Sequence, residues 1–217
     1  MLNAPPNSPA VGAGVFVAFE GGDGAGKSTQ ARILGDWLSE QGREVVLTRE
    51  PGGTELGRTV RDVVLHGGHV TPRAEALLFA ADRAHHVATV VRPALERGAV
   101  VLTDRYLDSS IAYQGAARKL ARTEVRDLSL WAAQGLLPHL TVLLDLAPRE
   151  GRSRRGAVHD RLEREDDDFH DRVRRGFREL AAADPDRYLV LDAARSPQHL
   201  HDEVQARFRR LDKVMTS

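Results

Sequence analysis

The stretch VFVAFEGGDGAGKS, residues 15–28, decides the fold. Its first five residues are apolar, β-branched or aromatic, which is typical of a strand buried on both faces. Residues 21–28 fit G-x-x-x-x-G-K-[ST], a glycine-rich turn whose backbone N–H groups surround an anion at the start of a helix. In such a loop Lys27 reaches the β- and γ-phosphates of a nucleotide and Ser28 ligates Mg²⁺. The stretch predicts a nucleotide-phosphate loop in preference to a merely flexible glycine turn.

Beyond this loop, short apolar runs alternate with helical patterns. The expected strands, besides residues 15–19, are residues 45–47, 99–103, 141–146 and 188–191. Continuous apolar strands separated by helices pair in parallel, because each helix returns the chain to the same end of the sheet. The sequence therefore predicts an α/β fold with a five-stranded parallel sheet and helices on both faces.

Two helices can be delimited from their termini. Thr71-Pro72 is expected to begin a long helix, and Pro93 to kink its last turn. One face of that helix is expected to carry Leu77, Ala80, Ala84, Val87, Val91 and Leu95. Ser196-Pro197 is expected to cap a final helix, whose buried face is expected to consist of Leu200, Val204, Phe208 and Leu211.

The domain organisation follows from composition along the chain. Residues 1–14, rich in Pro, Gly and Ala, are expected to form a flexible N-terminal tail. Residues 15–212 are expected to form one domain, and residues 213–217 a C-terminal tail. The stretch 149–168 crowds arginines with acids and lacks an apolar period, so it is interpreted as a mobile loop between helices or, alternatively, a solvated helix surface.

The overall composition excludes several classes of function. The 217 residues carry 31 basic and 31 acidic side chains and no cysteine. Zero net charge argues against a protein that coats nucleic acid or a membrane surface, and no segment is apolar enough to span a bilayer. Without cysteine there is no disulfide scaffold, thiolate zinc site or cysteine nucleophile. A cytoplasmic location with no nucleic-acid or membrane partner is expected. The basic residues comprise 28 arginines and only three lysines.

Asp104 follows the apolar run at residues 99–103, and Arg105 follows Asp104. In an open parallel sheet the carboxyl ends of the strands face the ligand. Asp104 is therefore expected to serve Mg²⁺ together with Ser28, although a carboxylate there could instead cap the next helix. Arg105 is expected to face bound phosphate.

The kind of phosphate-loop protein can be narrowed by elimination. A GTPase needs an Asn-Lys-x-Asp segment to bind guanine, but the two asparagines, Asn3 and Asn7, both lie in the tail. A helicase or motor would normally be larger and carry a basic track. The small size and the many arginines favour a kinase that acts on a small phosphorylated acceptor.

Six segments, in order, resemble the thymidylate kinase family. They are FEGGDGAGKSTQ at 19–30, TREPGGT at 48–54, LLFAADR at 77–83, DRY at 104–106, SSIAYQG at 109–115 and DRLE at 160–163. The resemblance covers residues 15–212. It implies a P-loop NTPase fold of the nucleoside monophosphate kinase type with a lid, acting as a homodimer. It also implies Mg²⁺-dependent transfer of the γ-phosphoryl group of ATP to dTMP, giving dTDP and ADP for dTTP biosynthesis.

The resemblance also implies roles for the acceptor residues. Phe79 would stack on thymine, Arg83 would donate to its exocyclic oxygen, and Tyr113 would disfavour a ribose. Arg49 and Arg105 would clamp the acceptor phosphate. The implied substrate-binding set is Asp23, Arg49, Phe79, Arg83, Arg105, Ser110, Tyr113 and Gln114. On the residues alone, a place in the core is favoured for Phe79 and Tyr113, and Arg83 could pair with a neighbouring acid.

On the donor side, some relatives carry an arginine at the position of Gly24, whereas this chain has Arg149, Arg152, Arg154, Arg155 and Arg161 in the stretch 149–168. The resemblance implies that Arg154 stacks on adenine and that Arg155 or Arg161 reaches the γ-phosphate. The implied ATP-binding set is Gly21, Gly22, Asp23, Gly24, Ala25, Gly26, Lys27, Ser28, Thr29, Arg154 and Arg195. The implied catalytic set is Lys27, Asp104, Arg105, Arg155 and Arg161.

Two alternatives stay open at this point. One is a kinase of the same architecture with another acceptor, such as deoxyuridylate or a free deoxynucleoside. The other, from a different class, is a nucleotide-binding regulatory module without turnover.

Overall fold

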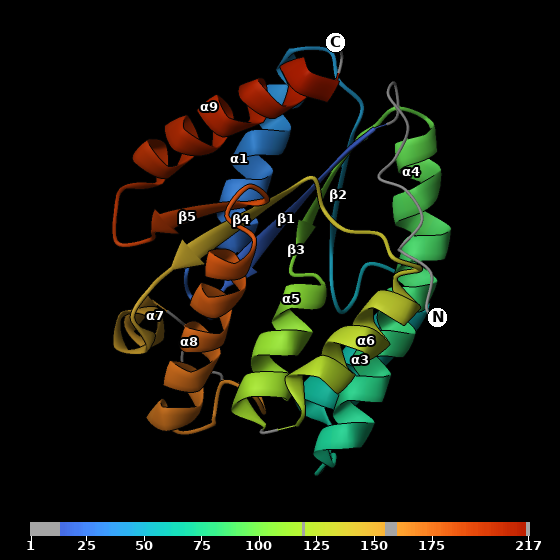
Figure 1. Cartoon of the computed structure of the whole chain (residues 1–217), viewed down its shortest axis with the longest axis vertical. Coiled ribbons are helices and arrows are strands. Elements are labelled where there is room, and N and C mark those ends of the chain that lie inside the picture. Colours follow the sequence, from blue (N-terminus) through green and yellow to red (C-terminus); the bar gives the residue numbers. More distant parts are fainter. Residues whose placement is uncertain (1–13, 119, 155–159, 216–217) are drawn as a thin grey trace.

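A single parallel sheet organises the chain. The computed structural model describes residues 14–118, 120–154 and 160–215. Its strands are β1 (Val15–Gly21), β2 (Val45–Arg49), β3 (Val100–Asp104), β4 (Leu140–Asp145) and β5 (Tyr188–Asp192), in the order β2-β3-β1-β4-β5 (Figure 1). All four strand pairings are parallel, as predicted.

Helices connect the strands and lie on both faces of the sheet. They are α1 (Lys27–Glu40), α2 (Glu55–Arg61), α3 (Pro72–His86), α4 (Arg92–Glu96), α5 (Leu107–Ser110), α6 (Arg122–Ala132), α7 (Pro148–Arg154), α8 (Asp167–Ala183) and α9 (Pro197–Met215). Three π-helical segments complete them: η1 (Asp62–His66), η2 (Val87–Val91) and η3 (Ile111–Ala117).

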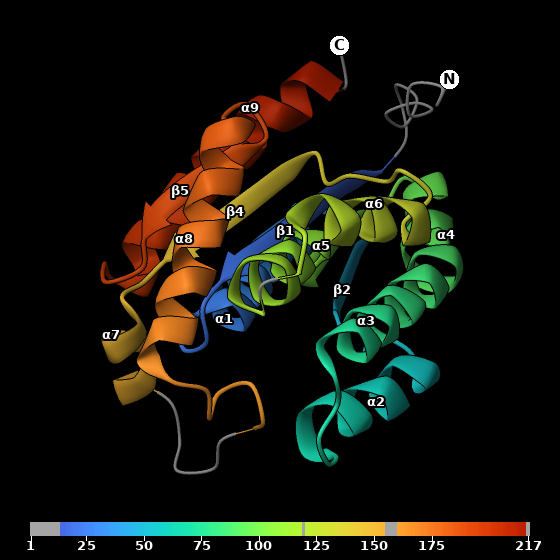
Figure 2. The same ribbon diagram turned by 60° about the horizontal axis from the view of Figure 1, so that its bottom comes forward.

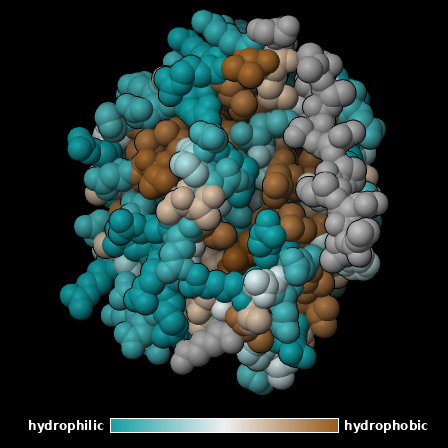
Figure 3. Space-filling model, viewed as in Figure 1, coloured by the Kyte–Doolittle hydropathy of each residue, from teal (hydrophilic) through white to brown (hydrophobic). Residues whose placement is uncertain are grey.

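The side chains of β1 divide the core into two layers. Val15, Val17 and Phe19 pack with the buried faces of α1 and α9, whereas Phe16 and Ala18 pack with η2, α4 and α5 on the other face. A third cluster packs α8 against η3 (Figure 2). Because β1 is buried on both faces, its apolar residues form a continuous run instead of alternating with polar ones. From the viewpoint of Figure 1, mostly hydrophilic side chains cover the helices, and apolar ones show in the hollows between them (Figure 3).

The sheet order brings two strand ends together. β1 pairs with β3, with Phe19 opposite Asp104, and with β4, with Gly21 opposite Leu144. The chain leaves β1 and crosses to α1, then returns to the far side of β3. This arrangement places the phosphate loop and the Asp104-Arg105 turn at the same edge of the sheet, where open α/β folds bind ligands.

The predicted long helix is helical from Pro72 to Glu96, through α3, η2 and α4. Its wider π-helical turn comes directly before Arg92-Pro93, since proline lacks an N–H and its ring crowds the preceding turn. Val87 and Val91 are buried as predicted. The placement of Leu77 was wrong: its side chain is 58% exposed, whereas the neighbouring Ala76 is buried in its place.

The ends of the described chain are ordered further than the sequence suggested. Gly14, assigned to the N-terminal tail, is buried and donates its N–H to the carbonyl of Leu95 at 2.7 Å. The last helix continues to Met215, beyond the predicted boundary at 212. The rest of the predicted N-terminal tail, residues 1–13, and residues 216–217 lie outside the described residues. Within the described residues, no helix has the length and apolar character to cross a membrane.

The start of α8 depends on Asp166. Its side chain accepts a hydrogen bond from the N–H of Phe169 at 2.7 Å, and its backbone is extended, as expected for an N-cap. Phe169 is buried beneath Tyr113, so the cap also fixes a side chain of the core.

We expect Asp166→Ala to lower the free energy of unfolding by about 1 kcal/mol, because it leaves an N–H group of the first helical turn without its partner. Urea unfolding followed by circular dichroism measures the change. Glu203→Ala, at an exposed site in α9, serves as the control and should unfold like the wild type. Equal midpoints for all three proteins would show that the cap does not stabilise α8.

Candidate active site

The phosphate loop has the backbone of an anion-binding turn. Gly26 adopts the left-handed conformation (φ 95°) directly before α1, which only glycine takes up without strain. The side chain of Lys27 is buried, and its ammonium donates to the carbonyl of Gly22 at 2.7 Å. Burial, and next the charge of Arg105, lower the pKa of Lys27. A bound phosphate would supply the negative charge that this ammonium otherwise finds only in nearby carboxylates.

The backbone of α7 closes over one side of the loop. Gly24 has a positive φ of 78°, and a Cβ at this position would lie 2.3 Å from the carbonyl oxygen of Gly151. Conversely, a Cβ at Gly151 would lie 2.4 Å from the carbonyl oxygen of Asp23. An arginine therefore does not fit at position 24 in this conformation, so an arginine that reaches the migrating phosphoryl group must come from another segment.

Two oxygen ligands meet beside the loop. Asp104 ends β3, and its Oδ2 accepts a hydrogen bond from the hydroxyl of Ser28, at the start of α1. Hydroxyl and carboxylate oxygens are the ligand types that Mg²⁺ takes from proteins of this kind. The structure thus brings together the two residues predicted to hold a metal.

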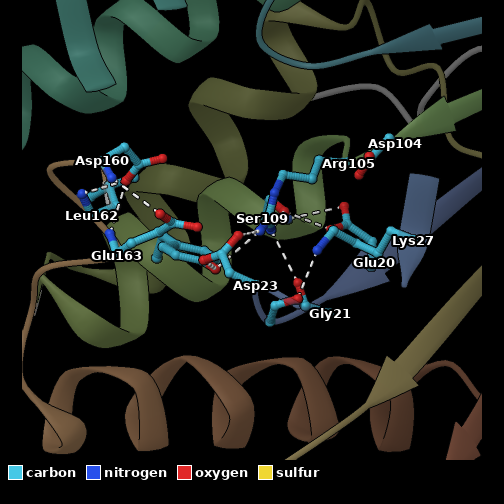
Figure 4. Close-up of polar contacts among 12 residues, drawn as sticks. Glu20, Gly21, Asp23, Lys27, Asp104, Arg105, Ser109, Asp160, Leu162 and Glu163 are labelled. Carbon is cyan, nitrogen blue, oxygen red and sulfur yellow. Dashed lines mark hydrogen bonds and ion pairs between the residues drawn. The ribbon is translucent and has the colours of Figure 1, made fainter. Parts of the chain in front are cut away.

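Arg105 is the centre of the polar network (Figure 4). Its backbone is left-handed (φ 69°), and its N–H donates to the carbonyl of Phe19 at 2.9 Å. The guanidinium donates to Asp23 at 2.5 Å, to Tyr113 at 3.2 Å and to the carbonyl of Gly21 at 3.1 Å. Burial alone would raise the pKa of Asp23, but the charges of Arg105 and Lys27 outweigh it and lower that pKa. The network ties the end of β3 to the phosphate loop.

Glu20 holds the turn that follows Arg105, and sequence reasoning missed this carboxylate. Its carboxylate is fully buried and accepts from the N–H groups of Tyr106 and Ser109, at 2.8 and 3.1 Å. The hydroxyl of Ser109 donates to Glu20 at 2.6 Å and accepts from Arg105 at 3.0 Å. Burial, and next the charge of Asp108, raise the pKa of Glu20 to about 7. Its position within the FEGG segment was the available signal.

A pocket lies beside this polar network, and we call it the acceptor pocket. It is lined by all but one of the residues predicted to bind the acceptor. These residues are Asp23, Phe79, Arg83, Arg105, Ser110, Tyr113 and Gln114. Phe79 is partly exposed, as a stacking platform must be, while the ring of Tyr113 packs edge-on to Phe169 and Phe177. The ring of Tyr113 is thus part of the core, while its hydroxyl contacts Asp23 and Arg105 at the edge of the pocket.

Arg83 pairs with a buried acid, as the residues alone allowed, and it also lies at the acceptor pocket. It borders the pocket, and it is held by Glu50 through Nε at 2.8 Å and by Ser110 at 3.2 Å. The other carboxylate oxygen of Glu50 contacts Nδ1 of His86 at 2.8 Å. Nε2 of that imidazole lies 2.7 Å from the hydroxyl of Thr48. Sequence reasoning missed both acid and imidazole: for Glu50 the available signal was its position within the TREPGGT segment, whereas the distant contacts of His86 leave no periodic signal.

The remaining acceptor residue, Arg49, is exposed and borders the phosphate-loop cleft together with Lys27 and Ser28. Arg61 of α2 borders both this cleft and the acceptor pocket, and it donates to the carbonyl of Pro51 at 3.2 Å. Sequence reasoning missed Arg61, one of 28 arginines, because nothing in its local pattern distinguishes it.

The predicted donor residues meet at a third depression. Arg154 donates to the carbonyl of Ala193 at 2.8 Å. Together with Arg195 it borders a pocket whose other wall is the phosphate loop around Gly24 and Gly26. Arg155 lies outside the described residues.

Arg161, the other candidate for the γ-phosphate, lies elsewhere. Its guanidinium donates to Glu75 and to the carbonyl of Val64 at 2.8 Å, on the far side of the acceptor pocket. It is not among the residues that border the phosphate-loop cleft. Its predicted catalytic role therefore has no support in this conformation.

Comparison with known proteins decides the family. A model of the family "Thymidylate kinase" matches residues 19–204. The chain belongs to the thymidylate kinase family. It is 65% identical over 198 residues to a thymidylate kinase of Clavibacter sepedonicus, covering 89% of this chain and 94% of that protein. It is 55% identical over 188 residues to one of Bifidobacterium longum, covering 84% and 91%.

A solved structure agrees. The crystal structure of thymidylate kinase from Ehrlichia chaffeensis superposes with a TM-score of 0.74 at 32% identity, covering 89% of this chain and 98% of that one. The fold class and the assignment as a kinase of the thymidylate kinase family, both predicted from the sequence, are thus confirmed.

One buried carboxylate of this thymidylate kinase fold yields a pH-dependent prediction. Burial, and next the charge of Glu50, raise the pKa of Asp82 from 3.8 to about 6. The folded state therefore binds this proton more tightly than the unfolded state does. The resulting stabilisation is complete below the unfolded pKa and is lost as the pH rises through 6.

We expect the stability of the wild type relative to Asp82→Asn to fall by up to about 3 kcal/mol between pH 4 and pH 7, and then to level off. Urea unfolding of both proteins at each pH measures the difference. Glu96→Gln, an exposed control, should follow the wild type throughout. A constant difference between wild type and Asp82→Asn would contradict the assigned cause.

Proposed function

We propose that the chain transfers the γ-phosphoryl group of ATP to dTMP, giving dTDP and ADP, by direct attack of the acceptor phosphate. The observation that carries the proposal is that the phosphate-loop cleft and the acceptor pocket share one arginine. Arg105 borders both the phosphate-loop cleft and the acceptor pocket. A group that contacts both substrates can hold the acceptor phosphate in line with the migrating phosphoryl group.

The acceptor pocket suits a thymine nucleotide. Phe79 offers an aromatic face to the base, and Arg83 still has N–H groups left for an exocyclic oxygen after its bonds to Glu50, Ser110 and Ser129. Tyr113 is fixed between Asp23 and Arg105. It is proposed to close the space beside C2′ of the sugar and so to disfavour a ribose, which carries a hydroxyl there. Ser110 and Gln114 complete the wall around the base.

The phosphate groups would be held by four cationic side chains from different parts of the chain. Lys27 is proposed to bind the β- and γ-phosphates of ATP, and Arg49 with Arg105 to clamp the acceptor phosphate. Arg61, which borders both sites, is added to that clamp.

Ser28 and Asp104 fit a magnesium ion, because their oxygens already lie within hydrogen-bonding distance of each other at the mouth of the phosphate loop. When bound, Mg²⁺ neutralises phosphate charge that develops during transfer. The chain itself orients these two ligands through the end of β3 and the first turn of α1.

The donor base is proposed to lie between Arg154 and Arg195, next to the phosphate loop. The stretch 149–168 is proposed to act as the lid, with Arg155 as the remaining candidate for the γ-phosphate, since Arg161 is engaged by Glu75. A lid of this kind excludes water while it delivers positive charge.

An acceptor panel tests the activity. ADP release from ATP should be stimulated by dTMP, less by dUMP, and not by thymidine, because a free nucleoside leaves the phosphate clamp empty. Lys27→Ala should lower the rate with dTMP by a factor of about 100 or more, whereas Lys213→Ala, on the exposed end of α9, should leave it unchanged.

Each alternative has its own result in this assay. Equal or better stimulation by another acceptor would replace dTMP as the substrate. No release with any acceptor would leave a nucleotide-binding regulatory module.

We also propose that the enzyme is a homodimer. The helices α3 and α6 pack against each other, and each exposes a large apolar side chain, Leu77 (58% exposed) and Trp131 (80% exposed). A second copy of the chain, covering these residues, would remove them from water.

We expect Trp131→Glu to convert the dimer to a monomer, because a charge would be buried in the interface. Light scattering after size exclusion measures the mass. Val214→Glu, at the equally exposed end of α9, should leave the mass unchanged. A monomeric wild type, or a Trp131→Glu protein that stays dimeric, would contradict the proposed interface.

A further inference from the structure

Glu75 of α3 is a fully buried carboxylate to which the proposed chemistry gives no role. Three side chains converge on it. Its Oε1 accepts from Nε2 of Gln114 at 2.8 Å and lies 3.5 Å from Nε of Arg118, and its Oε2 accepts from the guanidinium of Arg161. The donors come from η3, from the turn after η3 and from the segment that follows residue 159, so Glu75 joins parts of the chain that are far apart in sequence.

The chemistry of these partners fixes one amide. A carboxylate without a proton can only accept hydrogen bonds, and both arginines can only donate. The NH₂ group of Gln114 must therefore point at Glu75, which makes Oε1 of that amide the atom available to a ligand. Gln114 is 1% exposed and borders the acceptor pocket, so its amide has little freedom to turn.

The two pyrimidine families differ at the atom that such an amide would contact. Thymine and uracil carry a hydrogen on N3, which donates, whereas N3 of cytosine accepts at neutral pH. A glutamine that offers its oxygen matches the first pair and leaves two acceptors facing each other with the second.

We propose that Glu75 is a positioning residue for base selection: it orients the Gln114 amide so that the acceptor pocket takes a base with an N3 hydrogen and rejects cytosine. The inference rests on the proposed function, because it concerns the same acceptor site. Glu75 touches no substrate; it acts through Gln114.

The arginines give the orientation its stability. Arg161 and Arg118 compensate the buried charge of Glu75. Arg161 is itself held by the carbonyl of Val64, while its neighbours Asp160 and Leu162 border the acceptor pocket. The contact that removes Arg161 from the phosphate loop thus holds the wall of the base site.

Two substitutions separate positioning from packing. In Glu75→Gln the new oxygen satisfies Arg161, and Arg118 keeps its ion pair with Glu165. The new NH₂ group then faces Gln114 and forces its amide to turn over. In Glu75→Asp the group is one methylene shorter but still only accepts, so the amide of Gln114 keeps its orientation even though the packing is poorer.

The test is the specificity constant kcat/KM of each protein for dTMP, dUMP and dCMP. Relative to the wild type, Glu75→Gln should lower the dTMP:dCMP ratio by about 10- to 100-fold, because a buried hydrogen-bonding mismatch is relieved. The dTMP:dUMP ratio should not change, since both bases carry the N3 hydrogen. Glu75→Asp should keep both ratios while raising KM for dTMP. A ratio measured on one sample does not depend on how much of the variant is folded.

The control is Glu165→Gln, which removes another acid that pairs with Arg118 and should leave both ratios unchanged. The inference is overturned if Glu75→Gln retains the wild-type dTMP:dCMP ratio, or if Glu75→Asp loses it to the same extent. A wild type that does not prefer dTMP to dCMP would instead refute the proposed function, and the role of Glu75 with it.

Discussion

The ion pair between Arg105 and Asp23 holds the two halves of the site together. Asp23 belongs to the phosphate loop after β1, and Arg105 follows β3, so the pair closes the edge where these neighbouring strands end. It lies mostly out of water, where an unpaired charge would cost several kcal/mol. The hydroxyl of Tyr113 accepts from Arg105 and donates to Asp23, so both partners of the pair also hold this hydroxyl at the acceptor pocket.

Buried carboxylates position the other polar groups of the site in the same way. Glu20 fixes the turn around Arg105, Glu50 holds Arg83, and Glu75 holds Gln114. Each has at most 4% of its surface exposed. A buried acid of this kind is a weak source of stability, but removing it leaves its partners without compensation. The precision of the arginines on the substrate side thus comes from a second layer of acids on the core side.

The sequence was sufficient to predict the side chains that line the pockets, but not the buried acids behind them. The run at residues 15–19 and the glycine pattern of 21–28 predicted a buried strand, a turn and a helix, because local sterics and burial determine all three. Family motifs supplied the acceptor residues. The partners of Glu50, His86 and Glu75 could not be found, since contacts over 30 or more positions in sequence leave no local period. The resemblance offered Arg161 as a candidate for the γ-phosphate, whereas in the structure its guanidinium is held by Glu75.

Arginine suits the buried positions of this site better than lysine, for two physical reasons. Burial lowers the pKa of a lysine, and it does so at Lys27, but a guanidinium keeps its charge in a dry site. Its five N–H groups also let it bond to a core acid and still reach a ligand, as Arg83 does between Glu50 and the acceptor pocket. An ammonium at position 83 could not form this fork. At position 27 a single point charge on a flexible stem is sufficient, because the phosphate loop supplies the remaining donors from its backbone.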